Sequence, residues 1–287
     1  MGIFDTIINS YLGYFNYLVD EILYPSWHNY FYWLLGLSIA VWMLEIIFPW
    51  RKNQAAFRKD FWLDGFYMFF NFFLFSLIGY NAISNIAVEA FNNCVTSFGR
   101  TNLVAINLAE LPVWSQFLIM FVLADFIQWN IHRLLHKSNY LWEFHKVHHS
   151  VEQMGFAAHL RFHWMETIIY KSIQYIPLAM IGFGIKDFFI IHIIAVAIGH
   201  LNHANLKITY GPFKYILNNP VMHLWHHAHQ LPKNRCGVNF GLSLSVWDYL
   251  FKTAYIPNEN EYEPLGFEGL EKFPKTFINQ ELYPFKT

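Results

Sequence analysis

Two histidine-rich stretches constrain this chain more than any other feature of its sequence. The first follows a long apolar run and holds His132, His136, His145, His148 and His149. The second repeats the HxxHH spacing at residues 223–227. Residues three and four apart lie on the same side of a helix, and neutral imidazole is a common ligand of divalent metals. The spacing therefore predicts that helices bring these imidazoles together around metal.

The composition indicates a polytopic membrane protein. The chain has 287 residues, of which 55% are hydrophobic and only 14% are charged, whereas soluble domains have about 25% charged residues. A net charge of −1 excludes a strongly basic surface for nucleic acid. Cys94 and Cys236 match no metal or redox spacing. The first residues lack the basic region of a signal peptide, so we expect no cleaved leader.

Apolar stretches of about 20 residues are long enough to cross a bilayer. We expect an interfacial helix over residues 1–24, followed by membrane spans at 30–50, 61–91 and 113–135, with a polar connection at 92–112. Asn71, Asn81 and Asn85 would form hydrogen bonds between helices. The run 167–200 is too long for one span and is interrupted at residues 182–184, which predicts a helical hairpin.

The basic pairs Arg51-Lys52 and Arg58-Lys59 follow the first expected span, which puts that side in the cytoplasm by the positive-inside rule. The resulting fold class is all-α: a polytopic transmembrane helical bundle with a cytosolic histidine-rich cap. It divides into residues 1–112 with the interfacial helix and the first two spans, a catalytic part at 113–253, and a cytosolic tail at 254–287.

A conservative count gives nine metal-binding imidazoles, with His200 as a further candidate. The nine are His132, His136, His145, His148, His149, His203, His223, His226 and His227. Nine donors are enough for two ions with four or five ligands each.

The remaining histidines have weaker ligand patterns. We expect His159 and His163 to line the pocket or to contact headgroups, and His192 to be a satisfied core residue. Asp125 lies seven residues before His132 on the same helical stripe, where a carboxylate needs a partner. It would hold a ligand imidazole by its other nitrogen or form a buried hydrogen bond between helices.

An imidazole-rich pair of sites suits iron as well as zinc. At a membrane it favours O₂ activation against a lipid C–H bond, giving either hydroxylation or desaturation. A membrane zinc hydrolase is an alternative from another class. A metal transporter or sensor is a third, but a transporter places ligands at mid-membrane depth, whereas these histidines gather at one end of the spans.

The order of these motifs resembles the fatty acid hydroxylase / sterol desaturase superfamily, and in particular its sterol-desaturase-like and alkylglycerol-monooxygenase-like branch. The resemblance covers residues 113–253 and is carried by DFIQWNIHRLLH (125–136), HKVHHS (145–150), NHAN (202–205), HLWHHA (223–228) and GVNFGLSLSVWDYLFKT (237–253). It implies a four-helix transmembrane bundle with the histidines on the cytosolic side. It also implies that the nine histidines bind iron and that Asp125, Asn239 and Asp248 act through those ligands.

The resemblance further implies the cofactors and partners. These are two iron ions (Fe), which zinc (Zn) can replace in purified protein, together with O₂ and a membrane lipid substrate: a fatty acyl chain, a sterol or an ether lipid. Electrons would come from tetrahydrobiopterin or from a separate cytochrome b5- or ferredoxin-type protein. The chain keeps Arg161 of the ether-lipid branch but has Gly155 and Ala158 where that branch has asparagine and threonine.

Overall fold

The computed structural model describes residues 3–75, 81–97, 99, 104, 108, 110–182, 185–232 and 235–286, and over these residues it contains helices and no β-strand. The predicted all-α class is therefore confirmed for this part of the chain. The α-helices are α1 (Ile3–Leu23), α2 (Tyr30–Ile47), α3 (Phe61–Phe69), α4 (Asn81–Ser97), α5 (Val113–Lys137), α6 (Asn139–His149), α7 (Trp164–Met180), α8 (Ile185–His203), α9 (Pro220–His226), α10 (Val246–Leu250) and α11 (Phe277–Leu282).

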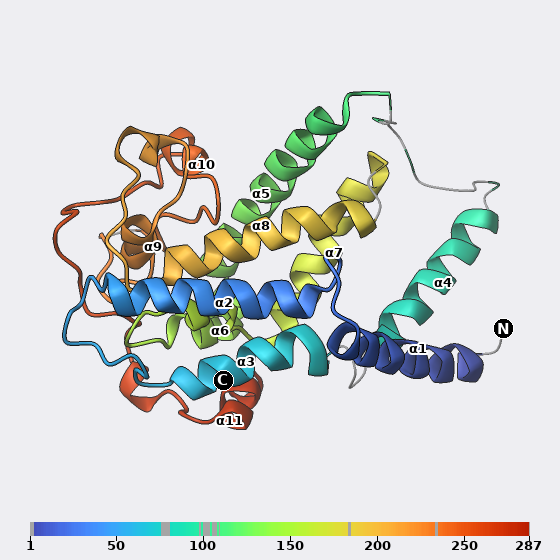
Figure 1. Cartoon of the computed structure of the whole chain (residues 1–287), viewed down its shortest axis with the longest axis horizontal. Coiled ribbons are helices and arrows are strands. Elements are labelled where there is room, and N and C mark those ends of the chain that lie inside the picture. Colours follow the sequence, from blue (N-terminus) through green and yellow to red (C-terminus); the bar gives the residue numbers. More distant parts are fainter. Residues whose placement is uncertain are drawn as a thin grey trace.

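The body of the molecule is built on α2, α5, α7 and α8 (Figure 1), with α2 packed on α8 and α5 packed on α7. Among the described helices, α2 and α5 are long and apolar enough to cross a membrane. Leu35, Ile39 and Met43, each four residues after the last, are 44%, 49% and 47% exposed along α2. An apolar stripe turned outward is what a lipid-facing helix presents, because lipid solvates it as well as a protein core would.

The expected hairpin over residues 167–200 corresponds to α7 and α8, which are separated by a turn that begins at residue 181. Of the expected Gly182-Phe183-Gly184 break, residues 183 and 184 lie outside the described part of the chain.

A single span over residues 61–91 is wrong. α3 ends at Phe69 and continues as one turn of π-helix over Phe70–Leu74, and a separate helix, α4, begins at Asn81. α4 packs on α1 at the opposite end of the molecule from α9 and α10 (Figure 1). The asparagines explain part of this arrangement: Asn71 donates to the carbonyls of Leu160 and Phe162, and Asn85 donates to Ser10 of α1. The side chain of Asn81 lies outside the described residues.

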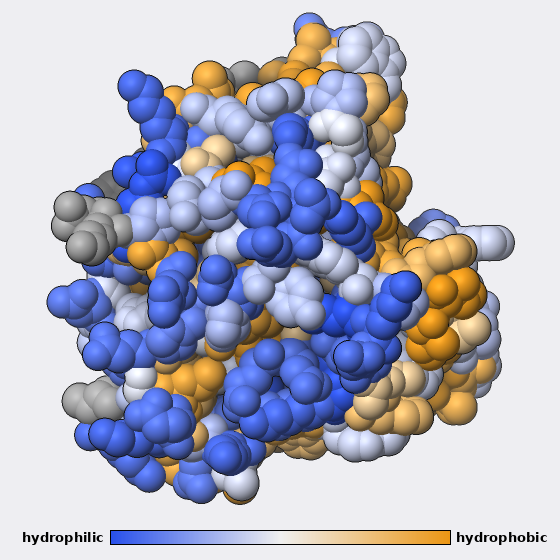
Figure 2. Space-filling view, turned by 90° about the vertical axis from the view of Figure 1, so that its left-hand side faces the viewer, coloured by the Kyte–Doolittle hydropathy of each residue, from blue (hydrophilic) through white to orange (hydrophobic). Residues whose placement is uncertain are grey.

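The end of the molecule that carries α9 and α10 is largely hydrophilic (Figure 2). Basic side chains of the 51–60 loop reach the segment that follows α6 at this end. Arg51 donates to the carbonyl of Met154 at 3.0 Å, and Lys59 pairs with Glu152. The same end therefore combines the basic loop with the histidine-bearing helix α6.

The C-terminal segment packs back on α3, where Tyr67 donates to Gln280 at 3.0 Å and the ring of Phe277 meets those of Phe66 and Phe70. Glu281, which follows Gln280, is buried. Its backbone carbonyl accepts a hydrogen bond from Nε2 of His163 at 2.8 Å. Burial raises the pKa of Glu281 to about 8.

This raised pKa gives a test of the C-terminal packing. A carboxyl group whose pKa is higher in the folded chain contributes stability that is present below its unfolded pKa of about 4.5 and is lost as pH rises through about 8. We expect Glu281→Gln, which stays neutral, to gain thermal stability relative to the parent protein as pH rises from 5 to 9. Unfolding in detergent would measure this. A melting-temperature difference that stays constant over that range would contradict the burial of an ionisable group here.

Candidate metal centre

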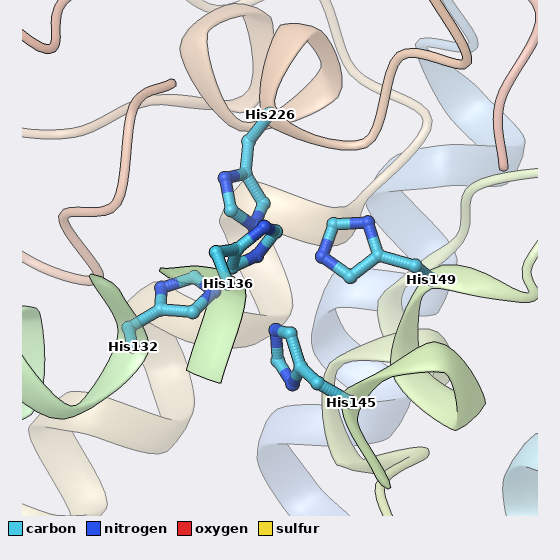
Figure 3. A group of neighbouring side chains, drawn as sticks. All are labelled: His132, His136, His145, His149 and His226. Atoms are coloured by element: carbon cyan, nitrogen blue, oxygen red, sulfur yellow. The ribbon is translucent and has the colours of Figure 1, made fainter. Parts of the chain in front are cut away.

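The nine predicted imidazoles gather into two buried groups of five and four, the numbers that two ions would need. In each group the ligand atoms lie within 4.8 Å of one another. The first, called group one, is shown in Figure 3, where rings from α5, α6 and α9 point toward a common centre. Group one contains His132, His136, His145, His149 and His226. Group two contains His148, His203, His223 and His227.

Each HxxHH motif is divided between the two groups. His145 and His149 of α6 belong to group one, but His148 belongs to group two. In the second motif, at residues 223–227, the division is reversed, because only His226 belongs to group one. Consecutive helical residues point about 100° apart, so adjacent histidines such as His148 and His149 cannot face one ion. Each motif thus supplies ligands to two sites. At the boundary between the groups, the rings of His149 and His227 stack with their centroids 4.3 Å apart.

Three imidazoles of group one are oriented by a single loop. His136, His226 and His132 point their Nδ1 atoms at the carbonyls of Cys236, Val238 and Phe240, at 3.2, 2.6 and 2.8 Å. These carbonyls belong to alternate residues of one loop, which therefore contacts all three rings. A carbonyl only accepts, so each Nδ1 carries the proton and each Nε2 keeps its lone pair.

The residues that the family resemblance singled out hold this loop in place. Asn239 has a positive φ of 50° and donates to the carbonyls of Met222 and Tyr255. Asp248 accepts from the backbone N–H groups of Phe240 and Gly241 at 2.9 and 2.8 Å. It also accepts from Trp129 of α5 and from the hydroxyl of Thr253.

Asp125 differs from its expected contact with an imidazole. Its oxygens accept from the backbone N–H groups of Ser243 and Leu244 at 3.0 and 3.3 Å, and from Nε1 of Trp247 at 2.9 Å. Nδ1 of His132 already donates to the carbonyl of Phe240. The Asp125 carboxylate instead fixes the next part of the loop. Asp125 therefore acts on the histidines through the backbone.

Two imidazoles of group two are also oriented by backbone carbonyls. Nδ1 of His148 donates to the carbonyl of Arg161 at 3.0 Å, and Nδ1 of His203 donates to that of Gly199 at 2.8 Å. The Arg161 side chain is buried and pairs with Asp64, which also pairs with buried Arg58. This network ties the carbonyl that orients His148 to α3.

The nitrogen atoms that face inward fit a cation. In group one the Nε2 atoms of all five histidines are buried and have no hydrogen-bond partner among the described residues. In group two the Nε2 atoms of His148 and His203 lie 3.3 Å apart although both rings already donate through Nδ1. Two lone pairs at that distance repel, whereas two neighbouring nitrogen ligands, each about 2.0–2.1 Å from one ion, lie this close together. Unpaired buried polar atoms are rare in proteins, so five together indicate a missing charge.

Burial keeps histidines of the two HxxHH motifs neutral at physiological pH, as ligands must be. Burial lowers the pKa of His148 to about 3. Burial, followed by the neighbouring imidazoles, holds the pKa of His149, His223 and His227 well below the usual value. Neutral imidazole offers a lone pair, so metal need not displace protons to bind.

The remaining histidines lie outside both groups. His200, the further candidate, contacts Ser38 through Nε2 and His159 through Nδ1, each at 3.2 Å. His159 lines the cavity described below, as expected. His163 packs against the C-terminal segment rather than headgroups. His192 meets the rings of Tyr30 and Phe72 on the cavity wall.

A cavity of about 390 Å³ reaches both groups, because His132, His145, His148, His203 and His223 are among its lining residues. Glu166 also lines it and was missed by the sequence reasoning. Its Oε2 lies 3.0 Å from Nδ1 of His145, so His145 pairs with a carboxylate where its neighbours pair with carbonyls. A carboxylate near the start of an otherwise apolar stretch is the signal that could have revealed it.

Nine buried imidazoles in two adjoining groups, carried by a structure that is helical over its described residues, define a candidate dinuclear metalloprotein. Residues 117–253 match the fatty acid hydroxylase family.

The relatives act on lipids. The chain is 33% identical to an ornithine lipid hydroxylase from Rhizobium tropici over 61% of its own length and 52% of that protein. It is 24% identical to an alkylglycerol monooxygenase from Caenorhabditis elegans over 85% of its length and 50% of that protein, and 31% identical to the human alkylglycerol monooxygenase over 50% and 34%. The chain thus spans about half the length, or less, of these curated relatives. No solved structure matches it.

The divided motif predicts separable metal losses. We expect His145→Ala to lower occupancy in group one and His148→Ala to lower it in group two, because these residues, one turn apart on α6, belong to different groups. Elemental analysis after reconstitution should show about one metal equivalent lost in each single variant and about two in the double variant. If each single variant loses both metal equivalents, the two groups do not bind metal independently.

The loop that orients group one gives a second prediction. Asp248→Asn replaces an acceptor that faces four donors. It should therefore cost about 1–3 kcal/mol of stability, because one donor is left facing another, and it should weaken metal binding. Thr253→Val is the matched control, since it removes one donor and leaves Phe240 and Gly241 held. If both variants retain metal equally, the loop is not what orients the histidines.

Proposed function

We propose that this chain is a membrane-bound monooxygenase that uses two iron ions, held by groups one and two, to hydroxylate a C–H bond of a lipid with O₂. The observation that carries the proposal is the set of five unpaired Nε2 atoms of group one beside a cavity that also reaches group two. Five imidazoles exceed the four ligands of a structural zinc site and suit an ion that accepts more nitrogen ligands, such as iron.

The reaction is balanced as follows. One oxygen atom enters the C–H bond to give an alcohol and the other leaves as water, with two electrons and two protons supplied by a reductant. Bound iron would supply the activation of O₂. The chain's own part is to hold the lipid. Phe72, Leu160 and Ile191 line the cavity with apolar surface, and His132 and His148 lie on its wall where they would bring the reacting carbon near the metal.

The substrate class rests on the relatives, whose names identify an ornithine lipid and alkylglycerols as substrates. For this chain we propose a membrane lipid with at least one long apolar chain. Reducing equivalents would come from tetrahydrobiopterin or from a cytochrome b5- or ferredoxin-type protein. Desaturation by the same centre would give a product two mass units lighter, and hydrolysis by zinc would need neither O₂ nor reductant.

The proposed location is an integral, multi-pass membrane protein with the metal centre at the cytoplasmic face. α2 and α5 support the membrane part. The contacts of Arg51 with Met154 and of Lys59 with Glu152 support the orientation, since they bring the basic loop to the end of the molecule that holds the histidines.

The test combines metal content with oxygen uptake. Protein from iron-replete cells should hold about two iron ions per chain, and should consume O₂ when given a reductant and total membrane lipid. The product should be sixteen mass units heavier than its substrate. His226→Ala should lose both iron and uptake, because it removes a donor from group one.

His28→Ala is the matched control, because His28 is exposed and lies outside both groups. It should retain iron and turnover. Zinc-loaded protein that hydrolyses a lipid without O₂, or iron-loaded protein that shows no lipid-dependent uptake with any of the reductants, would overturn the oxygenase assignment.

A further inference from the structure

The lining of the cavity combines apolar and polar side chains. Phe72, Ile191 and Val196 are among the apolar ones. Helices α5 and α7 carry Gln128, Thr167, Tyr170 and Gln174, which together are called the polar wall. The last three are spaced three and four residues apart, so α7 presents one polar stripe along the cavity. A pocket built only for a saturated hydrocarbon chain would have no reason for such a stripe.

Three of these polar side chains have hydrogen-bonding capacity left over. Within the described part of the chain, Gln128 and Tyr170 have no side-chain hydrogen bond, and the hydroxyl of Thr167 is buried without a partner. Gln174 on the same stripe is different, because it donates to the carbonyl of Ala124 at 3.0 Å. Gln174 thus links two helices, whereas the other three have no hydrogen-bond partner among the described residues. Leaving polar groups unpaired in an apolar setting is costly, which points to a ligand.

The unpaired side chains lie close to the histidines along the helices. Gln128 is one turn before His132 on α5, a separation of about 6 Å. Thr167 directly follows Glu166, whose carboxylate meets the imidazole of His145. A group bound by this polar wall is therefore only a few bonds away from the carbon that reaches the metal groups.

We propose that the cavity recognises a lipid chain bearing an amide or hydroxyl group close to the carbon that reacts, and that Gln128, Thr167 and Tyr170 determine this specificity. The inference rests on the proposed function in treating the cavity as the substrate site. The side-chain amide of Gln128 offers a donor and an acceptor side by side, which a secondary amide matches, and either hydroxyl can complete the pairing. A saturated hydrocarbon chain would leave these three side chains hydrogen-bonded to water or unpaired.

The experiment compares two probes of equal length in detergent-solubilised full-length protein: an acyl chain with one internal secondary amide, and the fully saturated acyl chain. Displacement of a fluorescent fatty acid gives their affinities without turnover. The parent protein should prefer the amide probe. Gln128→Leu, Thr167→Val and Tyr170→Phe should each weaken its binding about three- to tenfold, the effect of one net hydrogen bond, and leave the saturated probe unchanged or tighter.

Two controls keep the outcome clear. Thr167→Ser keeps a hydroxyl and should restore the preference, while Tyr140→Phe makes the same chemical change at an exposed residue of α6 and should have no effect. Equal affinity of the parent for both probes, or equal loss of affinity for both probes in the variants, would overturn the proposal. The polar wall would then bind only water. Amide preference in a protein that never consumes O₂ would instead refute the oxygenase and keep this inference.

Discussion

The hydrogen bond from an imidazole Nδ1 to a fixed acceptor is the interaction on which the rest of this structure depends. It sets the tautomer, and the tautomer decides which nitrogen faces the centre. Cys236, Val238 and Phe240 supply that acceptor in group one, and Gly199 and Arg161 supply it in group two. All five of these acceptors are backbone carbonyls, so the orientation of the centre depends on the path of the main chain more than on individual side chains.

This dependence explains why buried polar groups occur in segments that supply no metal ligand. The carboxylates of Asp125 and Asp248 accept from the backbone of the 240–244 loop, and a side chain added at Gly241 would meet the carbonyl of Leu244 at 2.4 Å. The pairing of Arg161 with Asp64 has the same purpose for group two. Buried ion pairs add little net stability, but here they fix the position of a carbonyl to which a ligand is bonded.

The sequence could reveal the ligands but not how they divide. Helical spacing is enough to collect nine histidines, because residues three and four apart must meet on one side of a helix. The group to which each histidine belongs depends on how α6 and α9 face each other. That tertiary arrangement cannot be read from a single sequence. The single span at 61–91 failed for a related reason: composition shows that a stretch is apolar, but the π-helical turn at Phe70–Leu74 and the packing of α4 on α1 depend on partners distant in sequence. Glu166 was missed because its partner, His145, lies on another helix.

The mixed lining of the cavity would allow one bundle to combine the proposed reactivity with selectivity. Apolar side chains from α8 and the π-helical turn exclude water, which strengthens every electrostatic interaction near the histidines. A wall that was apolar throughout would bind any lipid chain at any depth, since hydrophobic contact has no direction. Polar side chains on α5 and α7 remove that freedom, because a hydrogen bond is made at one depth and lost when the chain slides by a carbon or two. Gln128 lies one turn before His132 on α5, and Thr167 follows Glu166, which meets His145. A chain held by these side chains would therefore place a defined carbon before the metal groups.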